Sequence, residues 1–103
     1  MEIARVKGTV VATRKDEKLS GYKMLILELA DVSGRDKGGA PIVALDSVDA
    51  GVGDLVLVVR GSSARQAMNM GATPVDAVII GIIDNIEFSG ESTYGGRHDQ
   101  ASK

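Results

Sequence analysis

The stretch of sequence that decides the fold lies in the middle of the chain and reads Gly51-Val52-Gly53-Asp54-Leu55-Val56-Leu57-Val58-Val59-Arg60-Gly61-Ser62-Ser63-Ala64-Arg65. Residues 55–59 are a continuous aliphatic run that follows a glycine-punctuated turn and ends at Arg60. A short apolar run of this kind is consistent with a strand buried on both faces. Beyond it, Ser62 or Ser63 is a suitable N-cap, so we expect a helix of at most two turns before Pro74.

Further strands are predicted on both sides of this stretch. Residues 3–13 alternate between two faces, which is the period of a half-buried strand, and Gly8 in their middle predicts a bend or a bulge. The longest apolar segment, residues 75–88, is dominated by Ile and Val, so we expect one strand with a bend at Gly81. The remaining strands are expected at residues 22–30 and 41–46.

Five short strands with one short helix predict an all-β fold, a small five-stranded, OB-like closed barrel. The 103 residues are enough for one domain. We place the barrel domain at residues 1–88 and expect residues 89–103 to form a polar C-terminal tail, flexible or docked on another surface. Residues 31–40, rich in glycine and charge, are expected to form a solvated, mobile loop.

Composition excludes several classes of function. The sequence has no cysteine and a single histidine, His98, so it offers neither a disulfide framework nor a Cys or His metal cluster. Twelve basic against fourteen acidic residues, with 3% aromatic residues, argue against binding of nucleic acid. The first residues lack the apolar core of a signal peptide, and no run approaches the ~20 residues that span a bilayer. We expect a small soluble intracellular protein that does not bind a membrane.

The glycine motifs do not indicate a nucleotide site. Gly51 and Gly53 lack the third glycine of the dinucleotide-binding fingerprint, and they lead into a strand rather than a helix. The Gly61-Ser62-Ser63 stretch could hold an anion at a helix start, but it lacks the Gly-Lys-Ser/Thr of a P-loop. Ordinary helix capping explains it more simply, and an assembly axis lined by these hydroxyls and Arg65 is a third interpretation.

The acidic residues and the lone histidine do not form a catalytic constellation either. The aspartates flank the predicted strands at turn positions, where Asp commonly caps backbone groups: Asp46, Asp49, Asp54, Asp76 and Asp84. Asp76 or Asp84 could also pair with Arg60 or Arg65. Ser92, His98 and Asp99 lie in a glycine-bearing tail without a nucleophile-elbow pattern. We therefore predict no catalytic residue, no metal site and no cofactor.

Aliphatic surface is the feature that remains unexplained. Hydrophobic residues make up 44% of the chain, and the run 55–59 and the segment 75–83 are apolar on both faces. Met24 and Ile26 add a second apolar face to another strand. The pattern leaves two alternatives open: these strands are covered within their own subunit, or they contact another subunit, because large exposed apolar patches are uncommon on monomers.

Four segments of the chain carry a resemblance to a known family. Residues 46–65 are similar to the central signature of the EutN/CcmL family of bacterial microcompartment vertex proteins, and residues 74–84 resemble its second signature. The opening residues 6–13 and 19–25 also fit the family's pattern, and the match extends over residues 1–88 in the family's order. The Gly-Ser-Ser-Ala-Arg stretch at 61–65 is the most specific part of it.

The resemblance implies a structural, non-catalytic protein that assembles as a cyclic pentamer. Such pentamers cap the vertices of a polyhedral shell in the bacterial cytoplasm, where they meet hexameric shell proteins. It further implies an axial or pore region at Gly61, Ser62, Ser63, Ala64 and Arg65. It implies a subunit interface at Val75, Asp76, Val78, Ile80, Gly81, Ile82 and Asp84, and residues 85–95 lying on a neighbour. The alternative is an OB-like module that binds single-stranded nucleic acid or a small ligand; a small enzyme is a third reading.

Overall fold

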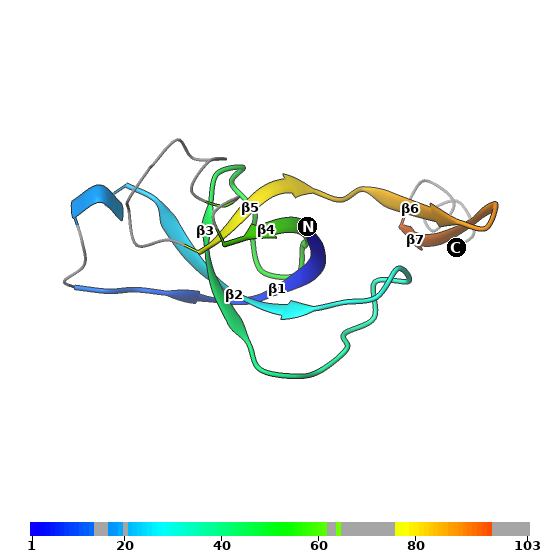
Figure 1. The fold of residues 1–103 in the computed structure, drawn as a ribbon, viewed down its shortest axis with the longest axis horizontal. Coiled ribbons are helices and arrows are strands. Elements are labelled where there is room, and N and C mark those ends of the chain that lie inside the picture. Colours follow the sequence, from blue (N-terminus) through cyan, green and yellow to red (C-terminus); the bar gives the residue numbers. More distant parts are fainter. Residues whose placement is uncertain (14–16, 20, 62–63, 65–75, 96–103) are drawn as a thin grey trace.

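The protein folds into a barrel with a hairpin standing outside it (Figure 1). The computed structural model describes residues 1–13, 17–19, 21–61, 64 and 76–95. The strands are β1 (Glu2–Val10), β2 (Lys23–Leu29), β3 (Ile42–Asp46), β4 (Leu55–Arg60), β5 (Ala77–Ile82), β6 (Asn85–Phe88) and β7 (Glu91–Gly95), and η1 (Glu17–Leu19) is a turn of 3-10 helix. The predicted all-β, five-stranded closed barrel is confirmed.

The barrel closes in the strand order β1-β2-β3-β5-β4. All neighbouring strands are antiparallel except β3 and β5, which run parallel. That parallel seam is short, because only Leu45 pairs with Val78 and Asp46 with Ile79. The molecule is elongated, with extents of 46 × 24 × 24 Å, because the β6-β7 hairpin continues away from the barrel.

Two apolar clusters cover opposite faces of the same strands. The barrel interior holds Ala4, Val6, Leu25, Leu27, Ala44, Ala50, Val56, Val58, Ala77 and Ile79. A second cluster on the outside of β3, β4 and β5 holds Leu45, Val59, Ala64 and Val78. The prediction that residues 55–59 are buried on both faces is therefore confirmed for most of the run, with Leu57 only half-buried. Part of the aliphatic excess is covered within the subunit itself.

Both predicted bends are β-bulges. On β1, Val6 pairs with Leu27 and Gly8 with Ile26, so the intervening residue has no partner across the ladder. On β5, the register shifts in the same way beside Gly81, which pairs with Leu57. Bulges increase the twist of a strand, and a small barrel needs that twist in order to close.

The segment predicted as one strand over residues 75–88 is two strands. The amide of Ile83 donates to the carbonyl of Leu55 at 2.8 Å. Leu55 is the first residue of β4, so β5 has no further partner beyond this bond. The chain then turns away at Asp84 and begins β6 at Asn85. The apolar pattern could not reveal this end, because it depends on the length of the partner strand.

Residues 91–95 add a strand that the sequence analysis did not predict. They pair with β6 through a turn at Ser89 and Gly90, which have φ angles of 55° and 80°. Positive φ at both central residues is the signature of a type I′ hairpin. The expected boundary between the barrel domain (1–88) and the tail (89–103) thus falls at a hairpin turn. The division into these two parts stays a prediction.

The expected short helix after β4 falls mostly outside the described residues. Of that segment the structure describes Ala64, which has helical backbone and is fully buried in the second cluster. Among the described residues, no helix is long and apolar enough to cross a membrane. The same part of the chain holds no group of three or more metal-binding side chains.

Candidate assembly surfaces

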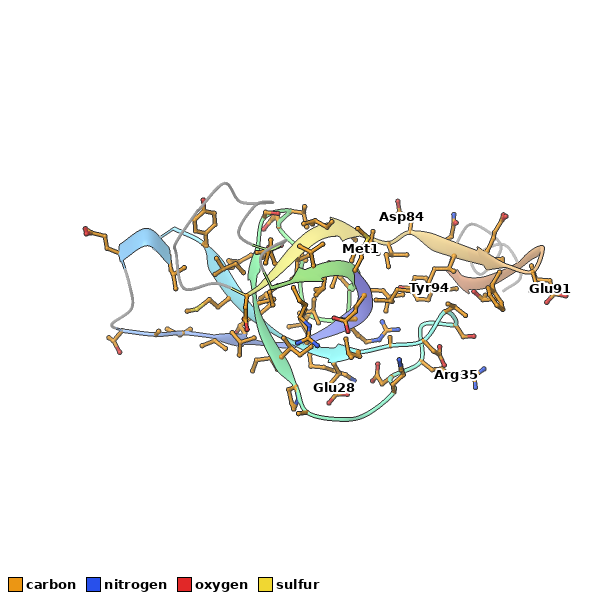
Figure 2. The ribbon with its side chains drawn as sticks, in the orientation of Figure 1. Met1, Glu28, Arg35, Asp84, Glu91 and Tyr94 are labelled. Atoms are coloured by element: carbon orange, nitrogen blue, oxygen red, sulfur yellow. The ribbon has the colours of Figure 1, made fainter. Side chains whose placement is uncertain are left out.

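The β6-β7 hairpin, here called the arm (residues 85–95), extends away from the barrel (Figures 1 and 2). Two-stranded hairpins are marginally stable on their own, so such an arm normally packs on something else. Its most prominent apolar side chain is Phe88, which is 57% exposed beside the turn. The arm therefore presents an apolar surface and unpaired strand edges to a partner.

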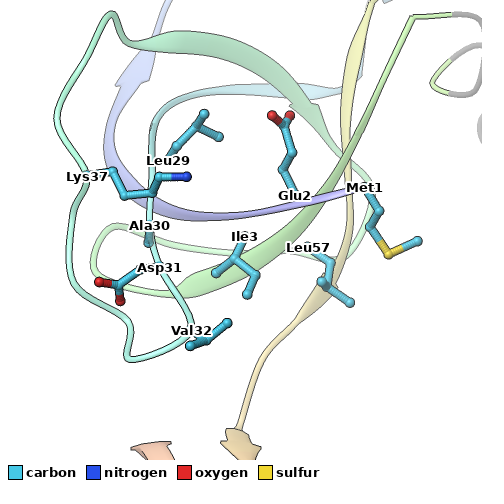
Figure 3. Close-up of a pocket in the computed structure, with 9 residues that line it drawn as sticks. All are labelled: Met1, Glu2, Ile3, Leu29, Ala30, Asp31, Val32, Lys37 and Leu57. Atoms are coloured by element: carbon cyan, nitrogen blue, oxygen red, sulfur yellow. The ribbon is translucent and has the colours of Figure 1, made fainter. Parts of the chain in front are cut away.

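An apolar groove of about 580 Å³ lies on the outer face of the barrel near the base of the arm (Figure 3). Its apolar lining comes from β1, β2, β4 and the residues that follow β2: Met1, Ile3, Leu29, Val32 and Leu57. Glu2, Asp31 and Lys37 stand at its sides. The groove is open rather than enclosed, so it suits a protein surface better than a small ligand.

The barrel end farthest from the arm carries a separate apolar region. A depression of about 220 Å³ is lined by Leu19, Met24, Val43 and neighbouring residues of β3 and β5, and Val43 is 51% exposed. Beside it, Tyr22 and the fully exposed Val11 flank a second depression of about 310 Å³. Exposed apolar side chains thus gather at both ends of the long axis of the molecule.

The predicted axial residues are placed only in part. Ser62, Ser63 and Arg65 lie outside the described residues. Gly61 follows β4 with a φ of 65°, and its amide donates to the carbonyl of Asp76 at 2.9 Å. Ala64 is buried and donates to the carbonyl of Gly61 at 3.1 Å. The structure thereby brings the start of the predicted axial segment next to the start of the predicted interface strand.

The predicted interface residues do not form one surface. Val75 lies outside the described residues, and Val78 is fully buried in the second cluster of its own subunit. Ile80 and Gly81 are half-buried, whereas Ile82 is 41% exposed. Asp76 and Asp84 are exposed at opposite ends of β5. The exposed part that continues toward the groove and the arm is therefore Ile82 and Asp84.

A buried carboxylate shapes the turn before β4. The side chain of Asp46 is 1% exposed, and it accepts hydrogen bonds from the amides of Val48 at 3.1 Å and Ala50 at 2.8 Å. Lys23 lies 3.5 Å from the same carboxylate and donates to Asp49 at 2.9 Å. The hydrogen bond to Asp49 raises the pKa of Lys23 above its ordinary value. Asp46 thus caps backbone amides of this turn, as the sequence analysis interpreted it, whereas the exposed Asp49 carboxylate contacts the side chain of Lys23.

Arg60 has a different partner from the one considered in the sequence. Its Nε lies 2.8 Å from a carboxylate oxygen of Glu2, across the β1-β4 ladder. The suggested pairing of Arg60 with Asp76 or Asp84 is therefore wrong. Glu2 pairs with Val58 in the β1-β4 ladder, two residues before Arg60, which brings its carboxylate to this side chain. The pairing suggested for Arg65 lies outside the described residues.

The first part of the loop at residues 31–40 is closed by its own hydrogen bonds, and its expected mobility stays a prediction. The Asp31 carboxylate accepts hydrogen bonds from the amides of Ser33 at 2.8 Å and Arg35 at 3.1 Å, and these amides lower the pKa of Asp31. Ala30 forms a bridge with Asp36, whose carboxylate pairs with Lys7. Residues 31–37 thus form a hydrogen-bonded loop. Its caps at Asp31 are local, whereas the contact of Asp36 with Lys7 joins distant parts of the chain and could not be predicted from the sequence pattern.

Comparison with known proteins identifies the same architecture elsewhere. The family described as "Ethanolamine utilisation protein EutN/carboxysome" matches residues 1–84. The carboxysome shell vertex protein CcmL of Nostoc sp. is 44% identical over 94 residues, covering 91% of this chain and 93% of that protein. Its solved structure has a TM-score of 0.83 and covers 93% of this chain and 100% of that one.

Two further relatives are described as microcompartment shell proteins. The bacterial microcompartment shell vertex protein EutN of Salmonella typhimurium is 40% identical, covering 91% of this chain and 94% of that protein. The pentameric microcompartment shell protein GrpN of Rhodospirillum rubrum is 40% identical with a TM-score of 0.75, covering 85% and 100% of the two chains. These relatives favour a shell protein over an OB-like module that binds nucleic acid. Matched along most of its length and in its fold, this chain belongs to the EutN/CcmL family.

Proposed function

We propose that this chain is a structural shell protein whose pentamers cap the vertices of a bacterial microcompartment, a polyhedral organelle that encloses metabolic enzymes in the cytoplasm. The observation that carries the proposal is the similarity, over nearly the whole chain, to vertex proteins and to a protein described as pentameric. The absence of a catalytic role is part of the proposal. It is supported by the relatives' description as shell proteins.

The shape of the subunit supports assembly into a ring. A cyclic ring of identical copies uses heterologous contacts, in which each copy presents two different patches to two neighbours. The arm with Phe88 and the outer apolar groove are two such unlike patches, and Ile82 lies on the strand that joins them. In this proposal the interface comprises the exposed residues of β5, the arm lies on a neighbouring copy, and the already buried Val78 supports the interface from beneath.

The axial role of residues 61–65 can be tested with one introduced thiol, because the chain contains no cysteine. We expect Ser63→Cys to form covalent dimers rapidly under mild oxidation. A disulfide requires the two Cα atoms to lie within about 7 Å, and the same residue of two neighbouring copies comes that close only near the ring axis. Ala40→Cys, at an exposed loop position, is the matched control. Cross-linking of Ala40→Cys at the same rate as Ser63→Cys would remove residues 61–65 from the axis.

The proposed partners of the pentamer are hexameric shell proteins. A flat hexagonal lattice of tiles cannot close on itself, and five-fold units supply the missing curvature. Hexameric shell protein from the same organism should therefore form open sheets or tubes alone and closed polyhedral particles when this chain is added, as seen by electron microscopy. Ile82→Asp, designed to keep the barrel but block ring formation, is the matched control. Equal closure with and without the chain would contradict the vertex function.

A further inference from the structure

The arm is joined to the barrel by a narrow connection. After Ile83 makes the last hydrogen bond to the barrel, Asp84 is the one residue between that bond and β6. At the other strand of the arm, a Cβ atom on Gly95, whose φ is 58°, would collide with the carbonyl oxygen of Asp84. A hairpin held only at this base is free to swing, unless a second contact fixes its direction.

The loop at residues 31–37, here called the bracket, supplies that second contact. The Thr93 hydroxyl on β7 donates to the carbonyl of Val32. Gly34 is buried directly under the ring of Tyr94, has a φ of 79°, and would drive a Cβ atom into that ring. Only glycine therefore fits at this point of contact between bracket and arm. Figure 2 shows Tyr94 on the side of the arm that faces the barrel and the bracket, whereas Arg35 points outward.

Arg5 on β1 ties the bracket, the barrel and the arm together. Its guanidinium donates to the carbonyl of Gly34 at 2.5 Å and to the carbonyl of Gly53 at 2.9 Å. The same group lies 5.9 Å from the centroid of the Tyr94 ring, within the range of a cation–π interaction. Its Nε is 3.4 Å from the carboxylate of Asp36, which Lys7 also contacts. The Arg5 side chain is only 24% exposed, so these interactions are partly shielded from water.

These contacts lie outside the barrel core. Arg5, Gly34 and Tyr94 belong to neither of the two apolar clusters. Their common effect is to hold the arm in one direction relative to the barrel. In a head-to-tail ring, the direction in which one copy reaches its neighbour determines the rotation between copies, and thus whether and at what size the ring closes.

We propose that Arg5, Gly34 and Tyr94 are positioning residues that select the five-fold ring by fixing the direction of the arm. The inference rests on the proposed function, because it assumes that the arm contacts a neighbouring copy. It goes beyond that function by assigning the choice of ring size to a contact inside one subunit rather than to the interface itself. Loosening the bracket should leave each barrel folded and each contact surface intact, and should broaden the distribution of assemblies.

The test compares the wild-type chain with Arg5→Gln, Gly34→Ala and Tyr94→Leu. Tyr94→Phe keeps the ring over Gly34 and should behave as wild type. Arg35→Gln removes the same charge as Arg5→Gln from an exposed side chain of the bracket, and it is the matched control. Native mass spectrometry measures the assemblies, and hydrogen exchange compares the amides of the arm with those of the barrel.

We expect several assembly sizes in the three bracket variants, one size in wild type and both controls, and exchange in the arm faster by about tenfold while barrel amides are unchanged. A single wild-type assembly size in all three variants would overturn the inference. So would complete loss of assembly by a folded Arg5→Gln or Gly34→Ala chain, which leaves the arm's own surface untouched. If the wild-type chain does not form a pentamer, the proposed function fails. In that case, arm exchange in the three bracket variants that matches wild type would also overturn the role of the bracket.

Discussion

The buried carboxylate of Asp46 offers the sharpest test of how the barrel is held together. Asp46 accepts two amide hydrogen bonds that close the turn leading to β4, and this turn carries the fully buried Ala50 into the barrel interior. Substitution of Asp46→Asn keeps the size of the side chain but replaces one acceptor oxygen by a donor. At least one of the amides of Val48 and Ala50 then loses its charged partner and faces an NH₂ group.

The magnitude follows from the number of bonds and their burial. A hydrogen bond to a charged group contributes about 1.5–3 kcal/mol, and a buried donor left unpaired costs about 1–3 kcal/mol. With one bond lost and the other weakened, Asp46→Asn should lower the free energy of unfolding by about 2–4 kcal/mol. Urea unfolding at one fixed protein concentration measures this, because dissociation of an oligomer makes apparent stability depend on concentration.

Asp49 provides the matched control. It shares the partner Lys23 with Asp46, but its side chain is 94% exposed. Exposed ion pairs contribute little to stability, so Asp49→Asn should have a much smaller effect. An Asp46→Asn chain that loses no more stability than the Asp49→Asn chain would refute the reasoning that burial of the capping carboxylate fixes this turn.

Three other predictions follow from the barrel, the bracket and the exposed strand. Ile79→Ala removes a fully buried side chain from the barrel interior and should cost about 2–5 kcal/mol in urea unfolding, against about 0.5–1.5 kcal/mol for Ile79→Val. The contact with Lys7 holds the pKa of Asp36 below its ordinary value of 3.8. The ionised carboxylate therefore stabilises the bracket above pH 3.8, and this stabilisation is lost as the pH falls through the lowered pKa. Hydrogen exchange in the arm, corrected for intrinsic rates, should accelerate below about pH 4. Asp36→Asn should reduce this step, with the remainder coming from Asp31, whose pKa is also lowered. Ile82→Asp should give folded monomers in native mass spectrometry, because the new carboxylate would be buried in an apolar interface. An intact ring would exclude Ile82 from the contact.

Local sequence patterns predicted the barrel well. The aliphatic run 55–59 and the glycines at 8 and 81 report directly on burial and on bulges, which are local consequences of side-chain type. The end of β5 was not predictable in this way, because the hydrogen bond from Ile83 to Leu55 depends on where a distant strand begins. The Ser89-Gly90 turn was visible in the sequence as a turn dipeptide, and attention to it would have predicted the arm.

The assembly surfaces were harder to predict from the residues alone. The groove combines side chains from β1, β2 and β4, and the bracket depends on Arg5 meeting residues 29 and 48 positions away. No periodic sequence pattern predicts such contacts between residues far apart in the chain. Val78 illustrates the converse difficulty: its apolar strand face looked available to a neighbour, yet the second cluster already covers it within the subunit.

The central claim is that five copies of this chain form one closed ring, and native mass spectrometry at micromolar concentration tests it most directly. We expect a single species at five times the 10.7 kDa mass of the subunit. A stable monomer at that concentration would contradict it.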